Sequence, residues 1–325
     1  MTYFWLEKHM HQWRESLATD HKPQAVIVSG ESGMAKTSLL ADMIKDLLCR
    51  KSETSCGQCQ NCLLFQNGSH PDVDRLIPEN NLIKVKQIRQ LSEFFTSTPH
   101  CSDHKVAVIE GAHQMNAAAA NALLKVLEEP PSRGLLFLVT DAKHQLMPTI
   151  RSRCITLDVF VSKSDKQQLG KWLADELAIS DEWLINDALA LSSWQPLTAL
   201  ELLKNDSMSI FQQQVELIYQ ALTQQQSIPA VAKSLSAYED VDHWVLIQRY
   251  CLQLVKVIMN SETHEIFSTH PLNQLVKNTP KVIHIIIKFT DLINAIMLNF
   301  NTQIKTQLMI ESVLIELKNE LNSRS

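Results

Sequence analysis

Four cysteines lie within a short segment of the chain, at Cys49, Cys56, Cys59 and Cys62. In a reducing compartment, cysteines clustered in this way indicate a metal site rather than disulfides. Four thiolates suit a tetrahedral structural Zn²⁺ that has no open position for catalysis. An iron–sulfur cluster is the alternative, because C-x2-C-x2-C spacing also occurs in ferredoxins, although Leu63 stands where ferredoxins usually carry a proline. The spacing therefore predicts a metal site, with zinc preferred over an iron–sulfur cluster and over unligated surface thiols.

The segment from Gly30 to Thr37, GESGMAKT, has the form of a phosphate-binding loop. It follows a β-branched apolar run and opens a helical pattern, the context in which G-x-x-x-x-G-K-[ST] loops cradle phosphates on backbone N–H groups. In that pattern Gly30 and Gly33 shape the loop. Lys36 reaches the terminal phosphates and Thr37 holds Mg²⁺. Ala35 replaces the glycine before the lysine. The sequence is therefore compatible with two alternatives: a loop that binds ATP, or a strand-to-helix turn that binds no ligand.

The residues that hydrolysis requires are incomplete. A second apolar run ends in Ile109-Glu110-Gly111, at the point where P-loop ATPases present an aspartate to the metal and an adjacent glutamate to the attacking water. Glu110 could approach a metal, although its side chain is one methylene longer than aspartate. Gly111 supplies no carboxylate, so we expect little or no ATP hydrolysis even where ATP binds.

Continuous apolar runs predict the strands that must carry these groups. They cover residues 25–29, 105–109, 135–140 and 154–160. Helical patterns over residues 38–48 and 116–129 lie between them, and Pro130-Pro131 ends the second helix. Strands separated by helices imply a parallel sheet covered on both faces, so residues 1–160 are expected to form an α/β nucleotide-binding domain.

Helical patterns replace the strand signals after Phe160. Residues 163–204 carry short helical patterns, and the pattern is helical from about Ser207 to the end of the sequence. One stripe on the last predicted helix consists of Ile310, Val313, Leu314, Leu317 and Leu321. We expect this stripe to pack within its domain or against a partner.

The composition bounds the class of protein. The chain has 325 residues, 45% of them hydrophobic and 20% charged, which excludes a disordered chain and a small disulfide scaffold. Seven glycines indicate a helix-rich chain, and the net charge of −5 means that any DNA contact needs a local basic patch. Lys84, Lys86 and Arg89 are candidates for such a patch, although a solvated helix face is the simpler interpretation. The best candidate for a membrane span, Val282–Ile287, is interrupted by His284 and ends at Lys288, so it is far too short and we expect a cytoplasmic protein.

Several of these features occur in an order that identifies a family. The degenerate phosphate loop is followed by the four-cysteine insertion, then by Asn121–Pro131 (NALLKVLEEPP) and by Ser152-Arg153-Cys154. This arrangement closely resembles the bacterial clamp-loader members of the AAA+ superfamily. The resemblance covers residues 1 to about 160. It implies an α/β P-loop AAA+ domain over residues 1–160 that carries the cysteine module at 49–62.

The resemblance also implies roles for particular residues. The four cysteines match the family's zinc ligands. Ser152-Arg153-Cys154 matches its SRC motif, in which the arginine is an arginine finger offered in trans to ATP bound by a neighbouring subunit. Thr140 matches the sensor position that reads the γ-phosphate. Leu197, by contrast, stands where an active motor would carry the sensor arginine of its second domain.

For the remainder of the chain, the resemblance implies a helical lid over residues 161–206 and an all-helical collar over 207–325. The expected function is that of a non-motor stator subunit in a ring with the gamma/tau motor and delta subunits. That ring loads the sliding clamp onto primed DNA and is part of a nucleotidyltransferase holoenzyme.

Two other functions remain as alternatives. Retained Lys36 and Thr37 would suit an active clamp-loader ATPase motor, which Gly111 and Leu197 oppose. An iron–sulfur DNA-processing protein is the less favoured alternative.

Overall fold

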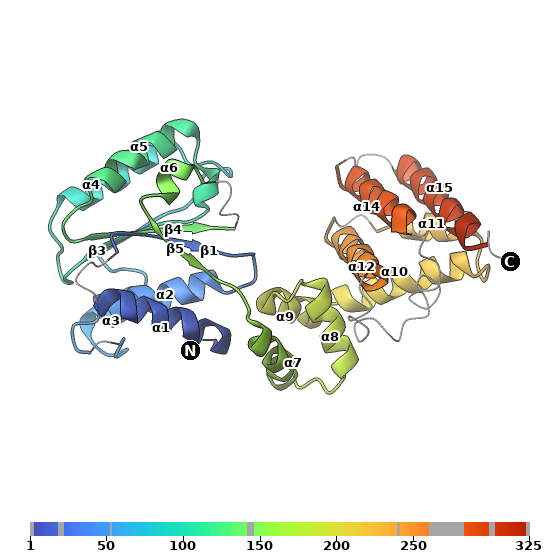
Figure 1. The fold of residues 1–325 in the computed structure, drawn as a ribbon, viewed down its shortest axis with the longest axis horizontal. Coiled ribbons are helices and arrows are strands. Elements are labelled where there is room, and N and C mark those ends of the chain that lie inside the picture. The colour runs from blue at the N-terminus through green and yellow to red at the C-terminus, as the bar shows by residue number, and fades with distance from the viewer. Residues whose placement is uncertain are drawn as a thin grey trace. The chain divides into compact units, whose positions relative to one another are not determined.

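The computed structural model describes seven stretches of the chain. They are residues 3–18, 23–52, 54–141, 146–238, 241–259, 283–298 and 303–322. The chain divides into two compact units, residues 1–166 and 167–325, which Figure 1 draws and which are described separately below.

The first unit contains a five-stranded parallel sheet. Its strands are β1 (Ala25–Ser29), β2 (Val73–Leu76), β3 (Lys105–Ile109), β4 (Gly134–Thr140) and β5 (Ile155–Asp158). The order across the sheet is β2-β3-β4-β1-β5, and every neighbouring pair is parallel. The residues of β1 and β3 are buried throughout, as expected for continuous apolar strands at the centre of a parallel sheet.

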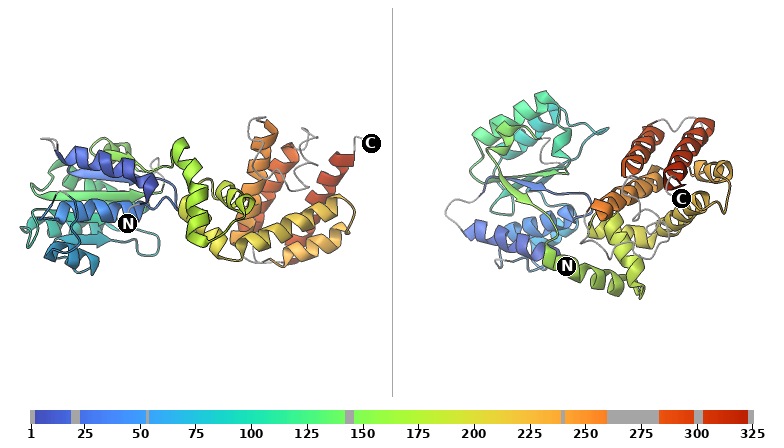
Figure 2. Two further views of the ribbon diagram at one scale, coloured as in Figure 1. Left: turned by 90° about the horizontal axis from the view of Figure 1, so that it is seen from below. Right: turned by 45° about the vertical axis from the view of Figure 1, so that its right-hand side comes forward.

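Helices cover both faces of this sheet. They are α1 (Glu7–Ala18), α2 (Lys36–Leu48), α3 (Gln60–Gln66), α4 (Val85–Thr96), α5 (Ala117–Glu128) and α6 (Pro148–Arg151), with single 3-10 turns η1 (Phe4–Leu6) and η2 (Ala112–Gln114). In Figure 1 and in the right-hand view of Figure 2, α4 and α5 lie on one face and α1 and α2 on the other. One buried cluster joins α4 and α5 to the sheet through Ile88, Leu91 and Leu123. The predicted parallel α/β arrangement is therefore confirmed.

The predicted elements differ from the structure mainly at the sheet edges. Local sequence patterns do not predict the edge strand β2, with sequence VDRL, because its two central residues are polar and leave no continuous apolar run. The other edge strand, β5, spans Ile155–Asp158 rather than 154–160, and its residues are half-buried or exposed. Helix α2 begins at Lys36, two residues before the predicted start, because Ala35 takes the N-cap position.

The second unit is helical in every part that the structure describes. Its helices are α7 (Lys163–Leu177, which begins in the first unit), α8 (Glu182–Leu191), α9 (Pro196–Lys204), α10 (Ser207–Leu222), α11 (Ile228–Ser236), α12 (Val241–Met259), α14 (Ile283–Leu298) and α15 (Gln303–Asn322). Among the described residues, no helix is both long enough and apolar enough to cross a bilayer. Val282, the first residue of the candidate segment Val282–Ile287, lies outside the described residues.

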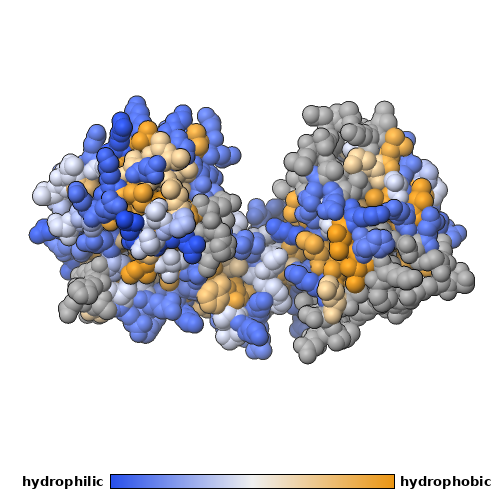
Figure 3. Space-filling model, turned by 45° about the horizontal axis from the view of Figure 1, so that its top comes forward, coloured by the Kyte–Doolittle hydropathy of each residue, from blue (hydrophilic) through white to orange (hydrophobic). Residues whose placement is uncertain are grey.

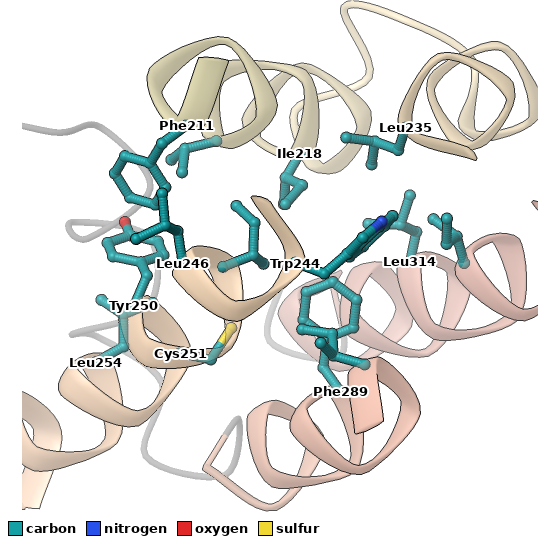
Figure 4. Packing of buried hydrophobic residues seen from close by; sticks show 14 of the residues in the cluster. Phe211, Ile218, Leu235, Trp244, Leu246, Tyr250, Cys251, Leu254, Phe289 and Leu314 are labelled. Carbon is teal, nitrogen blue, oxygen red and sulfur yellow. The ribbon is translucent and has the colours of Figure 1, made fainter. Parts of the chain in front are cut away.

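One hydrophobic cluster joins α8, α10, α11, α12, α14 and α15, and residues of α9 pack against it. In Figure 4 the Trp244 side chain lies between Ile218 of α10 and Leu314 of α15, with Phe289 of α14 beside it. The predicted stripe on the last helix contributes Ile310, Val313, Leu314 and Leu317 as buried residues, with Leu321 packed against them. This confirms that the stripe packs within its own unit. The cluster also includes residues of α8, so helices on both sides of the predicted lid–collar boundary share it.

Candidate functional site

The structure brings the four predicted metal ligands together. The Sγ atoms of Cys49, Cys56, Cys59 and Cys62 all lie within 4.8 Å of one another, so the cluster could hold a metal ion. Cys49 caps the C-terminus of α2, Cys59 caps the N-terminus of α3, and Cys62 lies in the first turn of α3. Two helix ends thus fix three of the four sulfur atoms. A set of four sulfur donors suits a soft or borderline metal rather than Mg²⁺ or Ca²⁺.

The protonation of the cysteines differs within the cluster. Burial alone would raise the pKa of the Cys49 thiol, but backbone N–H donors, chiefly that of Cys56, lower it to about 6. The backbone N–H of Cys62 is the main cause that lowers the pKa of Cys59. Burial raises the pKa of Cys62 to about 12. A metal ion bound here must therefore displace a proton from at least Cys62, which makes metal affinity fall as pH falls.

A buried aspartate supports this module from outside. Asp72 accepts hydrogen bonds from the backbone N–H groups of His100 (2.6 Å), Cys101 (2.8 Å) and Ser102 (2.9 Å), and from the Ser102 hydroxyl (2.9 Å). Burial alone would raise the pKa of this carboxyl, but these donors hold it well below its usual range. Asp72 thereby fixes the loop at residues 100–102. The Asn61 side chain of α3 donates a hydrogen bond to the Cys101 carbonyl in this loop (3.2 Å), which links the loop to the cysteine cluster. No local spacing in the sequence indicated this role for Asp72.

His70, Asp72 and Cys101 form a second group whose ligand-type atoms lie within 4.8 Å of one another. The His70 Nδ1 atom accepts the backbone N–H of Asp72 (3.1 Å), and its Nε2 atom lies 3.7 Å from the Cys101 Sγ. Nδ1 and both Asp72 oxygens are therefore already hydrogen-bonded. These hydrogen bonds tie the start of β2 to the loop at residues 100–102, so this group acts as a structural anchor.

The predicted phosphate loop has the expected strand–loop–helix position between β1 and α2. Gly33 has φ +77° and Ala35 has φ +63°, so the alanine adopts the left-handed conformation that a glycine favours. A Cβ on Gly30 would lie 2.6 Å from the Val159 carbonyl oxygen, which explains the glycine there. Thr37 is exposed in the first turn of α2.

Lys36 does not extend into solvent. Its side chain is 8% exposed, and its ammonium donates to the carbonyl oxygens of Gly30 (2.9 Å) and Glu31 (2.8 Å) and to the Asp141 carboxylate (2.5 Å). The lysine that the sequence assigns to phosphate is thus bound by oxygens of its own chain.

The end of β3 lacks the geometry for a catalytic glutamate. Gly111 has φ +59°, and a Cβ there would lie 3.0 Å from Pro78 and 3.3 Å from the Gln114 side chain. A larger residue at position 111 would therefore be strained as well as crowded. The Glu110 carboxylate lies 4.0 Å from Arg75, so it already has a cation on its own domain.

The two positions that match nucleotide sensors of the family, Thr140 and Leu197, are buried or apolar. Thr140 is 1% exposed at the end of β4, and its hydroxyl lies 3.2 Å from Nδ1 of His113. Leu197 is half-buried in the first turn of α9.

Arg153 lies between α6 and β5 and is exposed. One guanidinium nitrogen donates to the Thr149 carbonyl (3.0 Å) and the other to the Glu128 carboxylate (2.8 Å) at the end of α5. Ser152 is exposed, whereas burial raises the pKa of the Cys154 thiol to about 11, so Cys154 is an unreactive packing residue.

The surface beside Arg153 is hollow and partly apolar. A cavity of about 280 Å³ is lined by Ser152, Arg153 and Cys154 together with Pro130 and Pro131. A larger groove between α4 and α5 adjoins this cavity. The cavity and the groove share Phe95, Val126 and Pro131 as lining residues. Figure 3 shows hydrophobic side chains gathered on this face of the first unit. Lys84, Lys86 and Arg89 are exposed at the start of α4.

A parallel sheet with a glycine-containing loop and a lysine between β1 and α2 defines a P-loop-type α/β unit, here followed by a helical unit. The family model described as "DNA polymerase III, delta subunit" matches residues 5–162. A Pseudomonas aeruginosa protein named DNA polymerase III subunit delta' is 31% identical over 265 residues, which is 79% of each chain. The chain belongs to this family of DNA polymerase III delta' subunits.

Two relatives from Haemophilus influenzae extend the comparison. The DNA polymerase III subunit delta' of that organism is 33% identical over 204 residues, and the match spans 62% of each chain. The DNA polymerase III subunit tau/gamma is 34% identical over 152 residues, 46% of this chain and 22% of that one. The second similarity is therefore confined to a part of each protein.

Proposed function

We propose that this protein is a non-motor subunit of the bacterial replicative clamp loader. It would assemble with gamma/tau motor and delta subunits and help to set the sliding clamp on primed DNA. Its family membership and its similarity to a tau/gamma subunit support this role. The observation that carries the proposal is the contrast between a buried, internally bound Lys36 and an exposed Arg153.

In this role Arg153 acts on ATP held by the neighbouring motor subunit. A guanidinium can stabilise the charge on a transferring phosphoryl group, an effect of about 10³–10⁵ in rate in GTPases. The Glu128–Arg153 pair is on the surface, where such pairs contribute about 0–1 kcal/mol, so exchange of the carboxylate for a phosphate is easy. The apolar groove beside Arg153 would bury against the neighbour.

The cysteine cluster is proposed to hold a structural Zn²⁺. The ligand set consists of four sulfur atoms: those of Cys49 and Cys59 at helix termini, that of Cys62 in the first turn of α3, and that of Cys56. Four protein ligands would complete the coordination of Zn²⁺ and leave no position for substrate. Elemental analysis of the purified protein tests this: one zinc and no iron per chain is expected. Iron with visible absorbance would support the iron–sulfur alternative instead.

The chain organisation is proposed to follow the family. An AAA+ domain over residues 1–160 and a lid over 161–206 would precede a collar over 207–325, which assembles the ring. The shared hydrophobic cluster of α8 to α15 would make the lid and collar a stiff support for a stator.

The function is tested by steady-state, clamp-stimulated ATPase activity of the assembled loader. Arg153→Ala should lower that activity at least about tenfold, and Arg153→Lys should restore little of it because a lysine lacks the planar fork. Arg151→Ala removes an exposed arginine from the end of α6, two residues before Arg153, and is the matched control. Equal activities for Arg153→Ala and Arg151→Ala would refute the proposed role.

The isolated protein separates this role from that of a motor. We expect no DNA-stimulated hydrolysis, since Gly111 offers no carboxylate to orient water. Hydrolysis that Lys36→Ala abolishes would instead identify a motor subunit.

A further inference from the structure

The Lys36 ammonium has a complete set of hydrogen-bond acceptors within its own chain. An ammonium carries three N–H donors. The three acceptors are the carbonyl oxygens of Gly30 and Glu31 and the carboxylate of Asp141. A phosphate can reach Lys36 only by displacing one of them.

Asp141 differs from the other two acceptors because it carries a charge. It directly follows β4, and its side chain is 59% exposed, whereas that of Lys36 is 8% exposed. The carboxylate therefore occupies the solvent side of the buried cation, the side from which an anion would approach. It would compete with a phosphate for Lys36 and also repel it.

The two carbonyl acceptors are held in place by contacts elsewhere in the loop. The Trp5 indole, which is 1% exposed, donates to the Met34 carbonyl (3.3 Å). Gly30 packs against the backbone of Val159, with no room for a Cβ. Because the loop is fixed on both sides of Glu31, the ion pair with Asp141 is the contact that can open with the least rearrangement.

We propose that Asp141 excludes nucleoside triphosphates from this loop by acting as the internal counter-ion of Lys36. The loop then keeps the backbone shape of a phosphate-binding loop, while the Lys36 ammonium binds oxygens of its own chain instead of a phosphate. This inference deepens the proposed non-motor role, since it names the residue that keeps the subunit's own site out of the nucleotide cycle.

Titration of the full-length protein with N-methylanthraniloyl-ATP and Mg²⁺ tests the proposal. Asp141→Ala should bind the nucleotide at least about tenfold more tightly than the wild type, because charged hydrogen bonds of buried groups have effects of this size. Glu31→Ala is the matched control: it removes an equal charge from the loop between β1 and α2 but leaves the Glu31 carbonyl that binds Lys36. It should change the affinity by less than about threefold. The Lys36→Met/Asp141→Ala double variant should lose the gain.

Two results would overturn the proposal. One is an Asp141→Ala affinity no tighter than that of Glu31→Ala. The other is a double variant that binds as tightly as Asp141→Ala, since the gain would then not pass through Lys36. Asp141→Asn, which keeps the side-chain shape, replaces the alanine variant if thermal melting shows that the latter is unfolded. The outcome is independent of Arg153: loss of ATPase in Arg153→Ala complexes without any effect of Asp141→Ala on nucleotide affinity would refute this inference alone.

Discussion

The two cations that the sequence assigns to phosphate chemistry lie in opposite environments. Lys36 is 8% exposed and donates all its N–H groups to oxygens of its own chain. The Arg153 side chain is 37% exposed and paired with Glu128, itself 51% exposed. The buried cation is tied to the fold, whereas the exposed one can change partners at little cost. A sequence motif thus indicates where a charged side chain lies in a fold. Only the contacts of that side chain show whether it can bind another molecule.

Loss of the proposed Zn²⁺ should have the largest effect on stability, and it should loosen the surroundings of Lys36 more than those of Arg153. Cys59→Ser should lose the metal and lower the free energy of unfolding by more than about 4 kcal/mol, since structural zinc sites contribute directly to folding. Because α2 connects Cys49 to Lys36, hydrogen exchange should rise in α2 and α3 and change little around Arg153. Cys101→Ser, outside the cluster, should retain the metal. Uniform exchange across the unit would contradict the difference between the two regions.

Asp72 provides a second buried charge whose partners are all within the chain. Asp72→Ala should cost about 3 kcal/mol, because it leaves three backbone N–H groups without their acceptor. The folded-state pKa of Asp72 is depressed, so its contribution is complete above its unfolded pKa of about 4 and is lost as pH falls below that value. Urea unfolding between pH 3 and 7 should show a shallower acid dependence in the variant. If the free energy of unfolding of Asp72→Ala depended on pH as that of the wild type does, Asp72 would not be the group whose protonation destabilises the fold at low pH.

Stability measurements compare Lys36 and Arg153 directly. Lys36→Met should lower the free energy of unfolding by about 2 kcal/mol, because two carbonyl oxygens lose a buried charged donor. Arg153→Ala should lower it by less than about 0.5 kcal/mol, as for other surface pairs. Chemical denaturation of both variants under the same conditions is the measurement. Equal losses would mean that the two cations are equally tied to the fold.

A small stabilising effect is expected at Ala35. Its φ of +63° is unfavourable for a residue with a Cβ, so Ala35→Gly should raise the free energy of unfolding by about 0.5–1 kcal/mol. Nucleotide affinity should not change, because the glycine leaves the ion pair of Lys36 intact. A thermal melt and a nucleotide titration of one preparation check both statements; tighter nucleotide binding would show that the Cβ, rather than Asp141, closes the loop.

Local sequence patterns predict the central sheet and the cysteine cluster, but they do not predict the partners of Lys36 and Asp72. Buried strands such as β1 and β3 are continuous apolar runs, and the four cysteines are close in the chain, so local patterns predict both. Edge strand β2 has two polar residues between Val73 and Leu76, so no local apolar pattern predicts it. The partners of Lys36 and Asp72 could not be predicted, because these contacts join residues 105 and 28–30 positions apart. Tertiary folding alone brings them together.

The most direct test of the account compares the two cations within the assembled clamp loader. Single-turnover hydrolysis of ATP should be measured for complexes that contain wild-type protein, Lys36→Met or Arg153→Ala. We expect hydrolysis with Lys36→Met to stay within about twofold of the wild type, and Arg153→Ala to slow hydrolysis at the adjoining motor site at least about tenfold. A large loss with Lys36→Met and none with Arg153→Ala would contradict this expectation.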